Sequence, residues 1–415
     1  MTDSSASVPS GSITSWPRTI LTGAQMLFVA FGALVLVPLL TGLDPSVALF
    51  TAGAGTLVFH AITRQSVPVF LASSFAFIAP IQGSVANFGV SATLGGLMAA
   101  GLVYVIMSQV VRLKGTGWLN RLLPAVVVGP VIMVIGLALA PVAVSMATGE
   151  TSENIGYGQA IVLSMSSLLV TLVLAVFGRG VLRLVPIMGG IVTGYLLALL
   201  MGVVDFTPIT EAGWVELPNF VAPSFHWAAI LFMIPVAIAP AVEHIGDMVA
   251  IGSVTRKNYL QSPGLHRTLL GDGLATMVAA LFGGPPNTTY SEVTGAVTLT
   301  RAFNPMIMVI AAIFAVVLAF VAKLGALLQT IPGPVMGGIM TLLFGSIAVV
   351  GMNTLVRAGH SLTAPRNLVV VSLILVFGIG GMQIGGGQFV LQGVSLAALV
   401  GIALNWLLPP AKEGE

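Results

Sequence analysis

The chain has no cysteine and carries very little charge. Only 7% of its 415 residues are Asp, Glu, Lys or Arg, whereas soluble domains carry about 25%. The lack of cysteine excludes disulfides and thiolate metal ligands, and it leaves the redox compartment open. The low charge excludes an ordinary water-exposed surface. Instead, 57% of the residues are hydrophobic and the mean hydropathy is +1.06.

The motifs of common soluble enzymes are also missing. There is no Walker-type phosphate loop, which argues against direct use of ATP. The five histidines include no pair at metal-ligand spacing. Nothing resembles a nucleophile paired with a base. We therefore expect no metal, no cofactor and no enzymatic activity.

Long apolar runs separated by short polar loops predict an all-α polytopic membrane protein with about fourteen spans, since each span needs roughly 20 apolar residues. The 49 glycines and 24 prolines predict that many of these helices are kinked, closely packed or broken. Residues 1–17 lack the basic region of a signal peptide and are expected to form a cytoplasmic tail. The expected spans are 19–40, 46–62, 68–84, 93–111, 123–146, 159–178, 186–204, 228–249, 268–283, 286–300, 305–322, 331–352, 367–382 and 388–407.

Charge is distributed unevenly over the loops between these spans. With the N-terminus inside, every Lys and Arg except Lys323 falls on the cytoplasmic side. This positive-inside bias predicts a multi-pass protein of the bacterial inner (plasma) membrane with both termini in the cytoplasm. The basic pI of 9.1 is therefore explained by the Lys and Arg residues of the cytoplasmic loops and does not indicate a nucleic-acid partner. The outer loops carry acidic residues instead: Asp44, Glu150, Glu153, Asp205, Glu211 and Glu216.

Two short patterns recur at about half the chain length. Ser73-Ser74-Phe75 is echoed by Thr288-Thr289-Tyr290, and Leu123-Pro124-Ala125-Val126 by Ile331-Pro332-Gly333-Pro334-Val335. With about seven spans in each half, the two halves have opposite orientations, as in the inverted repeats of secondary transporters. Chance similarity in a sequence of low diversity is the alternative.

The spans that hold the first pattern are poor helices. Pro68 and Pro80 bracket one of them, and Pro285-Pro286 opens the other. Proline removes a backbone donor, and small hydroxyl residues favour extended backbone. Such backbone is tolerated at membrane depth only where it faces protein or a polar cavity. We therefore expect two half-extended segments that face each other at the membrane centre.

Four carboxylates lie in or near predicted spans: Glu243, Asp247, Asp272 and Glu292. A charged group at the bilayer centre costs at least ~2.5 kcal/mol, so it marks function by default. The i, i+4 spacing of Glu243 and Asp247 places both on one helix face, where mutual repulsion suits groups that bind and release a proton. Static hydrogen bonding to neighbouring helices is the alternative.

Glu292 follows Tyr290-Ser291 in the broken segment, where a carboxylate can accept N–H donors from a planar heterocycle such as uracil. Phe75, from the opposing segment, stacks on such a ring or serves ordinary packing. Asp272 is expected to pair with Arg267 or to cap a helix start. His244 points to another face and is expected to be a packing residue.

The sequence resembles the nucleobase/ascorbate transporter family, and within it the bacterial uracil permeases, over nearly the whole chain. Three positions depart from the family pattern: Val293 replaces the usual Asn, Asp247 stands where uracil permeases can carry a histidine, and Phe344 replaces a tyrosine. The motifs that carry the resemblance are Ser73-Ser74-Phe75-Ala76-Phe77, Glu243-His244-Ile245-Gly246-Asp247, Pro263-Gly264-Leu265-His266-Arg267, Asn287-Thr288-Thr289-Tyr290 and Ile331-Pro332-Gly333-Pro334-Val335-Met336-Gly337-Gly338.

The resemblance implies a fold of two inverted seven-span repeats with short antiparallel strands in spans 3 and 10. It implies a core domain of residues 18–112 and 228–323, a gate domain of residues 121–204 and 331–407, and a homodimer. It also implies the site residues. Substrate binding falls to Glu243, Glu292, Phe75, Tyr290, Ser291 and Ser74, and proton coupling to Asp247, Glu243 and Glu292.

The function expected from residues and resemblance together is proton–nucleobase symport, with uracil as the substrate and an elevator-like movement of core against gate. A purine or xanthine permease of the same family is the first alternative, favoured by Asp247. An anion transporter or channel of the same architecture is another. Two midplane glutamates argue against it, since anion sites use helix N-termini and basic groups.

Overall fold

The computed structural model describes residues 16–152, 154–359, 361–386 and 389–409. The predicted cytoplasmic tail therefore lies outside the described residues except for its last two. The long helices are α1 Trp16–Thr41, α2 Pro45–Thr63, α4 Val90–Lys114, α8 Tyr157–Phe177, α12 Ile238–Thr255, α13 Leu265–Leu281 and α17 Gly333–Ala358.

Shorter helices complete the fold. They are α3 Ile78–Phe88, α5 Thr116–Leu122, α6 Ala125–Ala138, α7 Ala140–Ala147, α9 Pro186–Leu200, α10 Thr207–Glu211, α11 Trp227–Met233, α14 Ser291–Thr300, α15 Met306–Ala319, α16 Ala322–Gln329, α18 Pro365–Ile379 and α19 Gly393–Leu407. Short 3-10 or π segments are η1 Phe75–Phe77, η2 Gly180–Leu184, η3 Pro235–Ala237 and η4 Leu260–Gly264. The strands are β1 Leu71–Ser73, β2 Asn287–Thr289, β3 Gln383–Gly386 and β4 Phe389–Gln392.

The length and hydropathy of the helices confirm a polytopic membrane protein. Among the described residues, 7 helical stretches are long and apolar enough to cross a membrane. They are α1, α2, α4, α8, α17, the joined α6 and α7 (Ala125–Ala147), and the stretch from α11 to α12 (Trp227–Thr255). An eighth candidate is the pair α15 and α16, which is bent by 84° at a short break. Shorter apolar helices include α9, α18 and α19. The number of about fourteen spans stays a prediction, since broken and short helices make up the remainder.

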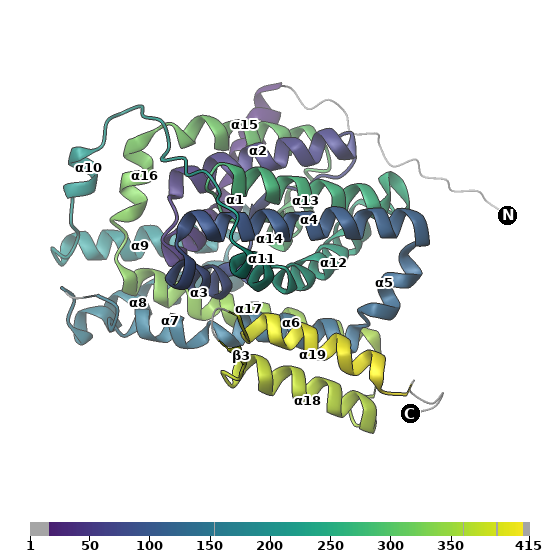
Figure 1. Cartoon of the computed structure of the whole chain (residues 1–415). Coiled ribbons are helices and arrows are strands. Elements are labelled where there is room, and N and C mark those ends of the chain that lie inside the picture. The colour runs from purple at the N-terminus through teal and green to yellow at the C-terminus, as the bar shows by residue number, and fades with distance from the viewer. Residues whose placement is uncertain (1–15, 153, 360, 387–388, 410–415) are drawn as a thin grey trace.

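The helices pack in two groups, which Figure 1 shows as an upper and a lower layer. In the first group α13 lies against α2 and α4, and α15 against α1 and α2. In the second group α17 lies against α6, α7 and α8, and α18 against α6 and α19. Each half of the chain contributes helices to both groups.

Glycines allow the central helices of each group to approach closely. A Cβ atom built on Gly273 of α13 would lie 2.9 Å from the carbonyl oxygen of Gly101 in α4. A Cβ atom on Gly129 of α6 would lie 2.9 Å from the carbonyl oxygen of Gly351 in α17. Membrane helices gain packing from such small residues, since lipid offers no hydrophobic drive for association.

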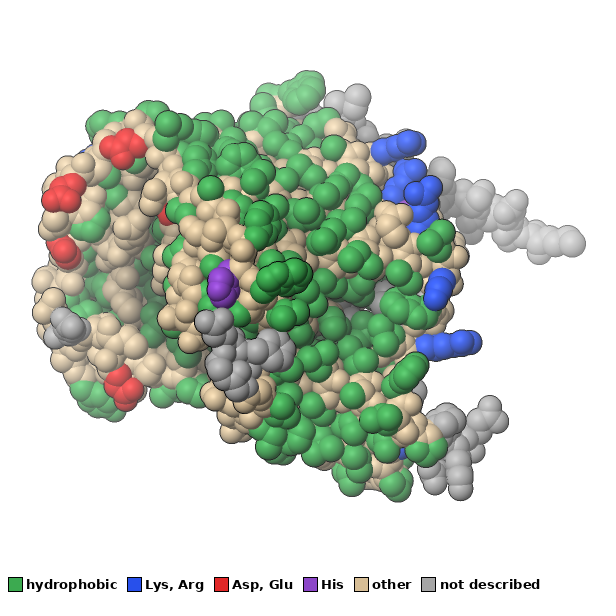
Figure 2. Space-filling model, in the orientation of Figure 1, with side chains coloured by type: hydrophobic (Ala, Val, Ile, Leu, Met, Phe, Trp, Pro, Cys, Tyr) green, Lys and Arg blue, Asp and Glu red, His purple; other side chains and the backbone are tan. Residues whose placement is uncertain are grey.

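The surface carries its charges at two opposite ends. Figure 2 shows Lys and Arg side chains at one end, Asp and Glu at the other, and mainly hydrophobic side chains between them. Large exposed apolar residues such as Leu113, Leu200 and Trp406 fit a lipid-facing belt. The charge separation follows the loop pattern that the sequence predicts.

The predicted broken segments form a strand pair inside the protein. Strand β1 lies within the predicted span 68–84 and β2 within 286–300, and the two pair antiparallel. Leu71 is opposite Thr289 and Ser73 is opposite Asn287. All six strand residues are buried. The expectation of two extended segments that meet is therefore confirmed.

Candidate functional site

Each strand of the central pair follows a proline and is followed directly by a helix. Pro68 precedes β1, and Pro286 precedes β2 and accepts a hydrogen bond from the backbone N–H of Ser74 at 2.9 Å. Helical segments then start at Phe75 and Ser291. The first turn of a helix leaves backbone N–H groups without intrahelical partners and carries a partial positive charge. Two such starts therefore border the strand pair.

A narrow cleft lies beside the strand pair, between the two helix groups. One side of the cleft consists of the strands, the segments after them and α12; its residues are Ser73, Ser74, Phe75, Ala76, Thr288, Thr289, Tyr290 and Glu243. The other side consists of α6 and α17; its residues are Ile132, Ile135, Ser346, Ile347 and Val350. The structure thus brings together four of the residues predicted to bind substrate: Ser74, Phe75, Glu243 and Tyr290. The side chains of Ser291 and Glu292 lie outside the described part of the chain, but their backbone forms the start of α14, directly after Tyr290.

Aromatic rings border this cleft. The Phe75 ring centroid lies 6.2 Å from that of Tyr290 at an interplanar angle of 39°, and 6.3 Å from that of Phe344 at 84°. Phe344 is buried on α17, so its ring joins the two helix groups through Phe75. Offset and edge contacts of this kind stabilise ring packing and leave flat faces for a planar ligand.

Asp247 does not line the cleft with Glu243. It is buried one turn further along α12, where its Oδ2 accepts a hydrogen bond from the Thr289 hydroxyl at 3.0 Å. Glu243 is only half-buried and borders the cleft. The i, i+4 spacing is therefore present, but strand β2 gives the two carboxylates different surroundings.

The expectation for Asp272 is wrong. The carboxylate is fully buried, and its Oδ2 lies 2.9 Å from His244 Nδ1. It also accepts a hydrogen bond from the backbone N–H of Thr289 at 3.3 Å. Because α13 begins at Leu265, Asp272 is two turns inside the helix and cannot cap its start.

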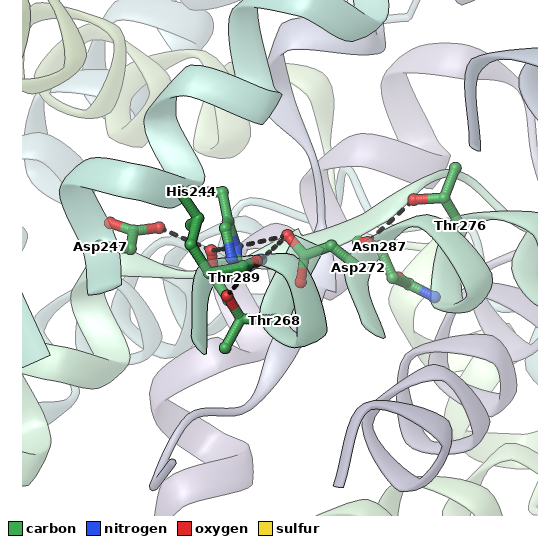
Figure 3. Close-up of polar contacts among 8 residues, drawn as sticks. His244, Asp247, Thr268, Asp272, Thr276, Asn287 and Thr289 are labelled. Atoms are coloured by element: carbon green, nitrogen blue, oxygen red, sulfur yellow. Dashed lines mark hydrogen bonds and ion pairs between the residues drawn. The ribbon is translucent and has the colours of Figure 1, made fainter. Parts of the chain in front are cut away.

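His244 is likewise more than a packing residue. Besides Asp272, its Nδ1 lies 3.1 Å from the Thr289 hydroxyl, so that α12, α13 and β2 meet at one polar cluster (Figure 3). The sequence carries one weak signal of this cluster. Asp272 and Thr276 are spaced i, i+4 on a helix that otherwise reads as apolar.

The two halves of the chain anchor their strands in the same way. In the first half, Thr56 Oγ1 accepts from the N–H of Leu71 at 2.9 Å, and His60 Nε2–H donates to the carbonyl of Val69 at 3.0 Å. In the second half, the carboxylate of Asp272 accepts from Thr289.

The donor of the second half is Thr276, whose hydroxyl donates to the carbonyl of Asn287 at 3.0 Å. Each anchoring helix, α2 or α13, thus places an acceptor and a donor one turn apart against its own strand. This correspondence indicates that the internal repeat extends to the hydrogen bonds.

A second cavity opens at the acidic end of the molecule, near Asp44, Asp205 and Glu216. These carboxylates serve local structure. Asp44 caps α2, and Glu216 accepts from the N–H of Gly213 at 2.7 Å. The hydroxyl and N–H of Thr207 donate to Asp205 and hold the pKa of its carboxyl below the usual range. None of the described residues that line this cavity is aromatic, and they offer no flat surface for a planar ring.

Interrupted apolar helices, with a cleft and a carboxylate at the interruption, are typical of membrane transporters. Within the described residues, no group of three or more His, Asp or Glu side chains stands close enough to hold a metal ion. The described residues of the cleft offer a carboxylate, aromatic rings and backbone groups that suit the binding of a small planar molecule.

Comparison with known proteins narrows the class. A model described as "Permease family" (Xan_ur_permease) matches residues 17–386, and the chain belongs to this family. A "Probable uracil permease" of Pasteurella multocida is 57% identical over 391 residues, covering 94% of each chain. The uracil permease of Bacillus caldolyticus is 45% identical, with 93% and 90% covered, and that of Escherichia coli K12 is 39% identical, with 94% and 90% covered.

Solved structures share the fold at low sequence identity. The transmembrane domain of the cyanobacterium bicarbonate transporter BicA has a TM-score of 0.67 at 14% identity, covering 95% of this chain and 98% of that one. The murine anion transporter Slc26a9 in the inward-facing state has a TM-score of 0.68 at 12% identity, covering 96% and 69%. The fold is therefore that of membrane transporters.

Proposed function

We propose that this chain takes up uracil across the bacterial inner membrane together with protons. The single observation that carries the proposal is the cleft at the strand pair, where Glu243, Phe75 and Tyr290 converge. Several relatives at 39–57% identity are named uracil permeases, which supports the same substrate here.

The cleft offers what a uracil ring needs. Uracil presents alternating N–H donors and carbonyl acceptors along its edge. The carboxylate of Glu243, with that of Glu292, accepts the N–H donors, and such charge-assisted hydrogen bonds are the strong ones. Backbone N–H groups of Tyr290 and Ser291 and the hydroxyl of Ser74 serve the carbonyls. The face of Phe75 packs on the ring.

The two helix groups correspond to the proposed core domain, residues 18–112 and 228–323, and gate domain, residues 121–204 and 331–407. The carboxylates and strands belong to the core, whereas the gate contributes a mainly apolar wall of Ile132, Ile135, Ile347 and Val350 with the hydroxyl of Ser346. Such a wall lets the core slide past with its substrate, as an elevator mechanism requires. A movement of this kind opens one substrate site first to one side of the membrane and then to the other.

Proton coupling is assigned to Glu243, Asp247 and Glu292. Glu243 and Asp247 lie one turn apart on α12, and two like charges so close oppose each other's ionisation. This repulsion supports a link between protonation and binding of a neutral base. The proposed orientation places the Lys/Arg-rich end and both termini in the cytoplasm. Assembly as a homodimer is proposed from the family resemblance.

A purine or xanthine substrate is the second candidate, because Asp247 stands where uracil permeases can carry a histidine. An anion substrate is disfavoured despite the shared fold with anion transporters. A carboxylate borders the cleft, and the described residues that line it include no Lys or Arg.

Radiolabelled uracil uptake into proteoliposomes, with and without an inward proton gradient, tests the proposal. We expect gradient-driven uptake that excess unlabelled uracil abolishes and that xanthine, guanine and hypoxanthine leave in place. Uptake that ignores the gradient would remove proton coupling. Gradient-driven uptake of radiolabelled xanthine, together with no uptake of radiolabelled uracil, would replace the substrate.

A further inference from the structure

A buried line of hydrogen bonds runs behind the cleft, from Asp247 through Thr289 and His244 to Asp272. It joins α12, β2 and α13, and Figure 3 shows the four side chains pointing toward one another. Of these four residues, only Asp247 is assigned to proton coupling. The role of His244 and Asp272 is therefore open.

The direction of each hydrogen bond follows from the groups involved. An ionised carboxylate only accepts, so His244 Nδ1 carries a hydrogen toward Asp272. His244 Nε2 is buried and has no partner among the described residues. A hydrogen on Nε2 would leave a buried donor unsatisfied, at a cost of about 1–3 kcal/mol. The neutral tautomer with its hydrogen on Nδ1 therefore fits this site.

This tautomer fixes the hydroxyl of Thr289. The Nδ1–H of His244 also faces Thr289 Oγ1 at 3.1 Å and occupies one of its lone pairs. The single hydroxyl hydrogen of Thr289 then points to Asp247 at 3.0 Å. The N–H of His244 therefore directs the Thr289 hydroxyl to donate toward Asp247. Asp272, which accepts from Nδ1, determines that this ring nitrogen carries the hydrogen.

The repeat shows what the carboxylate of Asp272 adds. Its counterpart in the first half is Thr56, whose neutral hydroxyl accepts the N–H of Leu71 in β1. A hydroxyl is thus sufficient to anchor a strand in this fold. The carboxylate in the second half does more, because it also accepts from the imidazole of His244 at 2.9 Å.

We propose that His244 and Asp272 are positioning residues that hold the Thr289 hydroxyl as a donor to Asp247, and thereby set the pH range of proton-coupled uptake. The inference rests on the proposed proton coupling. A hydrogen bond donated to a carboxylate stabilises its ionised form relative to its protonated form. Without the Thr289 donor, Asp247 keeps its proton to a higher pH.

Other titratable groups near the line remain in place in every variant described below. Glu243 lies on α12 itself, Tyr104 faces the line from α4, Tyr290 follows β2, and Glu292 belongs to α14. Helices α6 and α19 and the η3 segment, which also pack against α12, have no titratable residue. The remaining titratable residues of α13, His266 and Arg267, lie in its first turn.

Uptake of radiolabelled uracil between pH 5 and 9 tests the inference in full-length protein. Thr289→Val keeps the side-chain shape without the hydroxyl, and His244→Phe removes the Nδ1 donor. We expect each to move the pH of half-maximal uptake upward by about one unit, the size of one hydrogen bond to a charged group. Thr289→Ser and His244→Asn, which keep the hydroxyl and a donor amide, retain the wild-type midpoint.

The double variant His244→Phe/Thr289→Val separates a shared route from two independent effects. If both residues act through the same hydroxyl, it moves the midpoint no further than either single variant. Thr276→Val is the matched control, because it removes an anchor of the same strand without touching Asp247. It is expected to lower the uptake rate and leave the midpoint unchanged.

The outcomes distinguish this inference from the proposed function. Wild-type uptake that is indifferent to the proton gradient would refute the proposed coupling itself. Gradient-driven wild-type uptake with an unshifted midpoint in Thr289→Val would overturn only the positioning role, as would an equal shift in His244→Asn and His244→Phe. If His244→Phe does not fold, the comparison of Thr289→Val with Thr289→Ser tests the positioning role by itself.

Discussion

Glu243 and Asp247 lie one turn apart on α12 and yet contact different parts of the protein. Glu243 is half-buried and borders the cleft, whereas Asp247 is 4% exposed and bonds to Thr289 behind it. Strand β2 passes close to the helix at Asp247, and this accounts for the difference. The proposed function therefore assigns contact with uracil to Glu243, whereas Asp247 is assigned to proton coupling alone.

Replacing Glu243 is expected to weaken uracil binding strongly. Glu243→Ala deletes the acceptor that faces the cleft, and a hydrogen bond to a charged group is worth about 1.5–3 kcal/mol, or a 10- to 150-fold weaker affinity. Calorimetric titration of the purified protein with uracil measures the loss. Glu150→Gln, on an exposed loop, is the control and should bind as wild type. Affinity retained in Glu243→Ala would take this residue out of the site.

Phe75→Leu is expected to weaken uracil binding about 3- to 10-fold, because an aromatic stack contributes roughly 0.5–1.5 kcal/mol beyond its buried area. Phe28→Leu removes a phenyl ring from the lipid-facing surface instead and should leave affinity unchanged. Competition binding with labelled uracil compares the two. Equal affinity in both variants would make Phe75 an ordinary packing residue.

The lack of cysteine allows the cleft to be probed with single introduced thiols. Ser346 is exposed and lines the cleft, and so Ser346→Cys should react with a maleimide more slowly when uracil is present. The neighbouring Val349 is also exposed but does not line the cleft, so Val349→Cys should be indifferent to uracil. Labelling rates in detergent provide the comparison. No protection at Ser346→Cys would place the substrate elsewhere.

The contact between α6 and α17 depends on glycine. A Cβ atom at Gly351 would lie 2.5 Å from the carbonyl of Gly129, whereas one at Gly345 of the same helix would meet nothing within 4 Å. Gly351→Val is therefore expected to destabilise the protein by about 1–3 kcal/mol through overpacking. Gly345→Val carries the same side chain in the same helix and should unfold near the wild-type temperature. Thermal unfolding of both variants decides whether this approach is as close as described.

Much of the site can be predicted from sequence patterns that span only a few residues. The prolines before β1 and β2 disfavour helix in their own spans, and both segments are extended in the structure. The i, i+4 spacing of Glu243 and Asp247 requires only one regular helix. Their different environments could not be predicted, because these depend on how β2 crosses α12.

The pairing of His244 with Asp272 illustrates what local patterns miss. Both residues lie in apolar helices, and the two positions are far apart in the sequence. A buried polar group must find a partner somewhere, but its own sequence does not say where. The arrangement of α12 and α13 around β2 supplies that partner.

The sequence by itself determined that this protein crosses a membrane, that its charges lie at opposite ends, and that two of its spans are broken. Composition, loop charge and proline suffice for these features because each acts within one segment. Only the tertiary structure decided that the broken spans pair as strands, that α6 and α17 close the other side of the cleft, and that Asp272 contacts His244. These contacts join residues far apart in the chain, and only the packing of helices can bring them together.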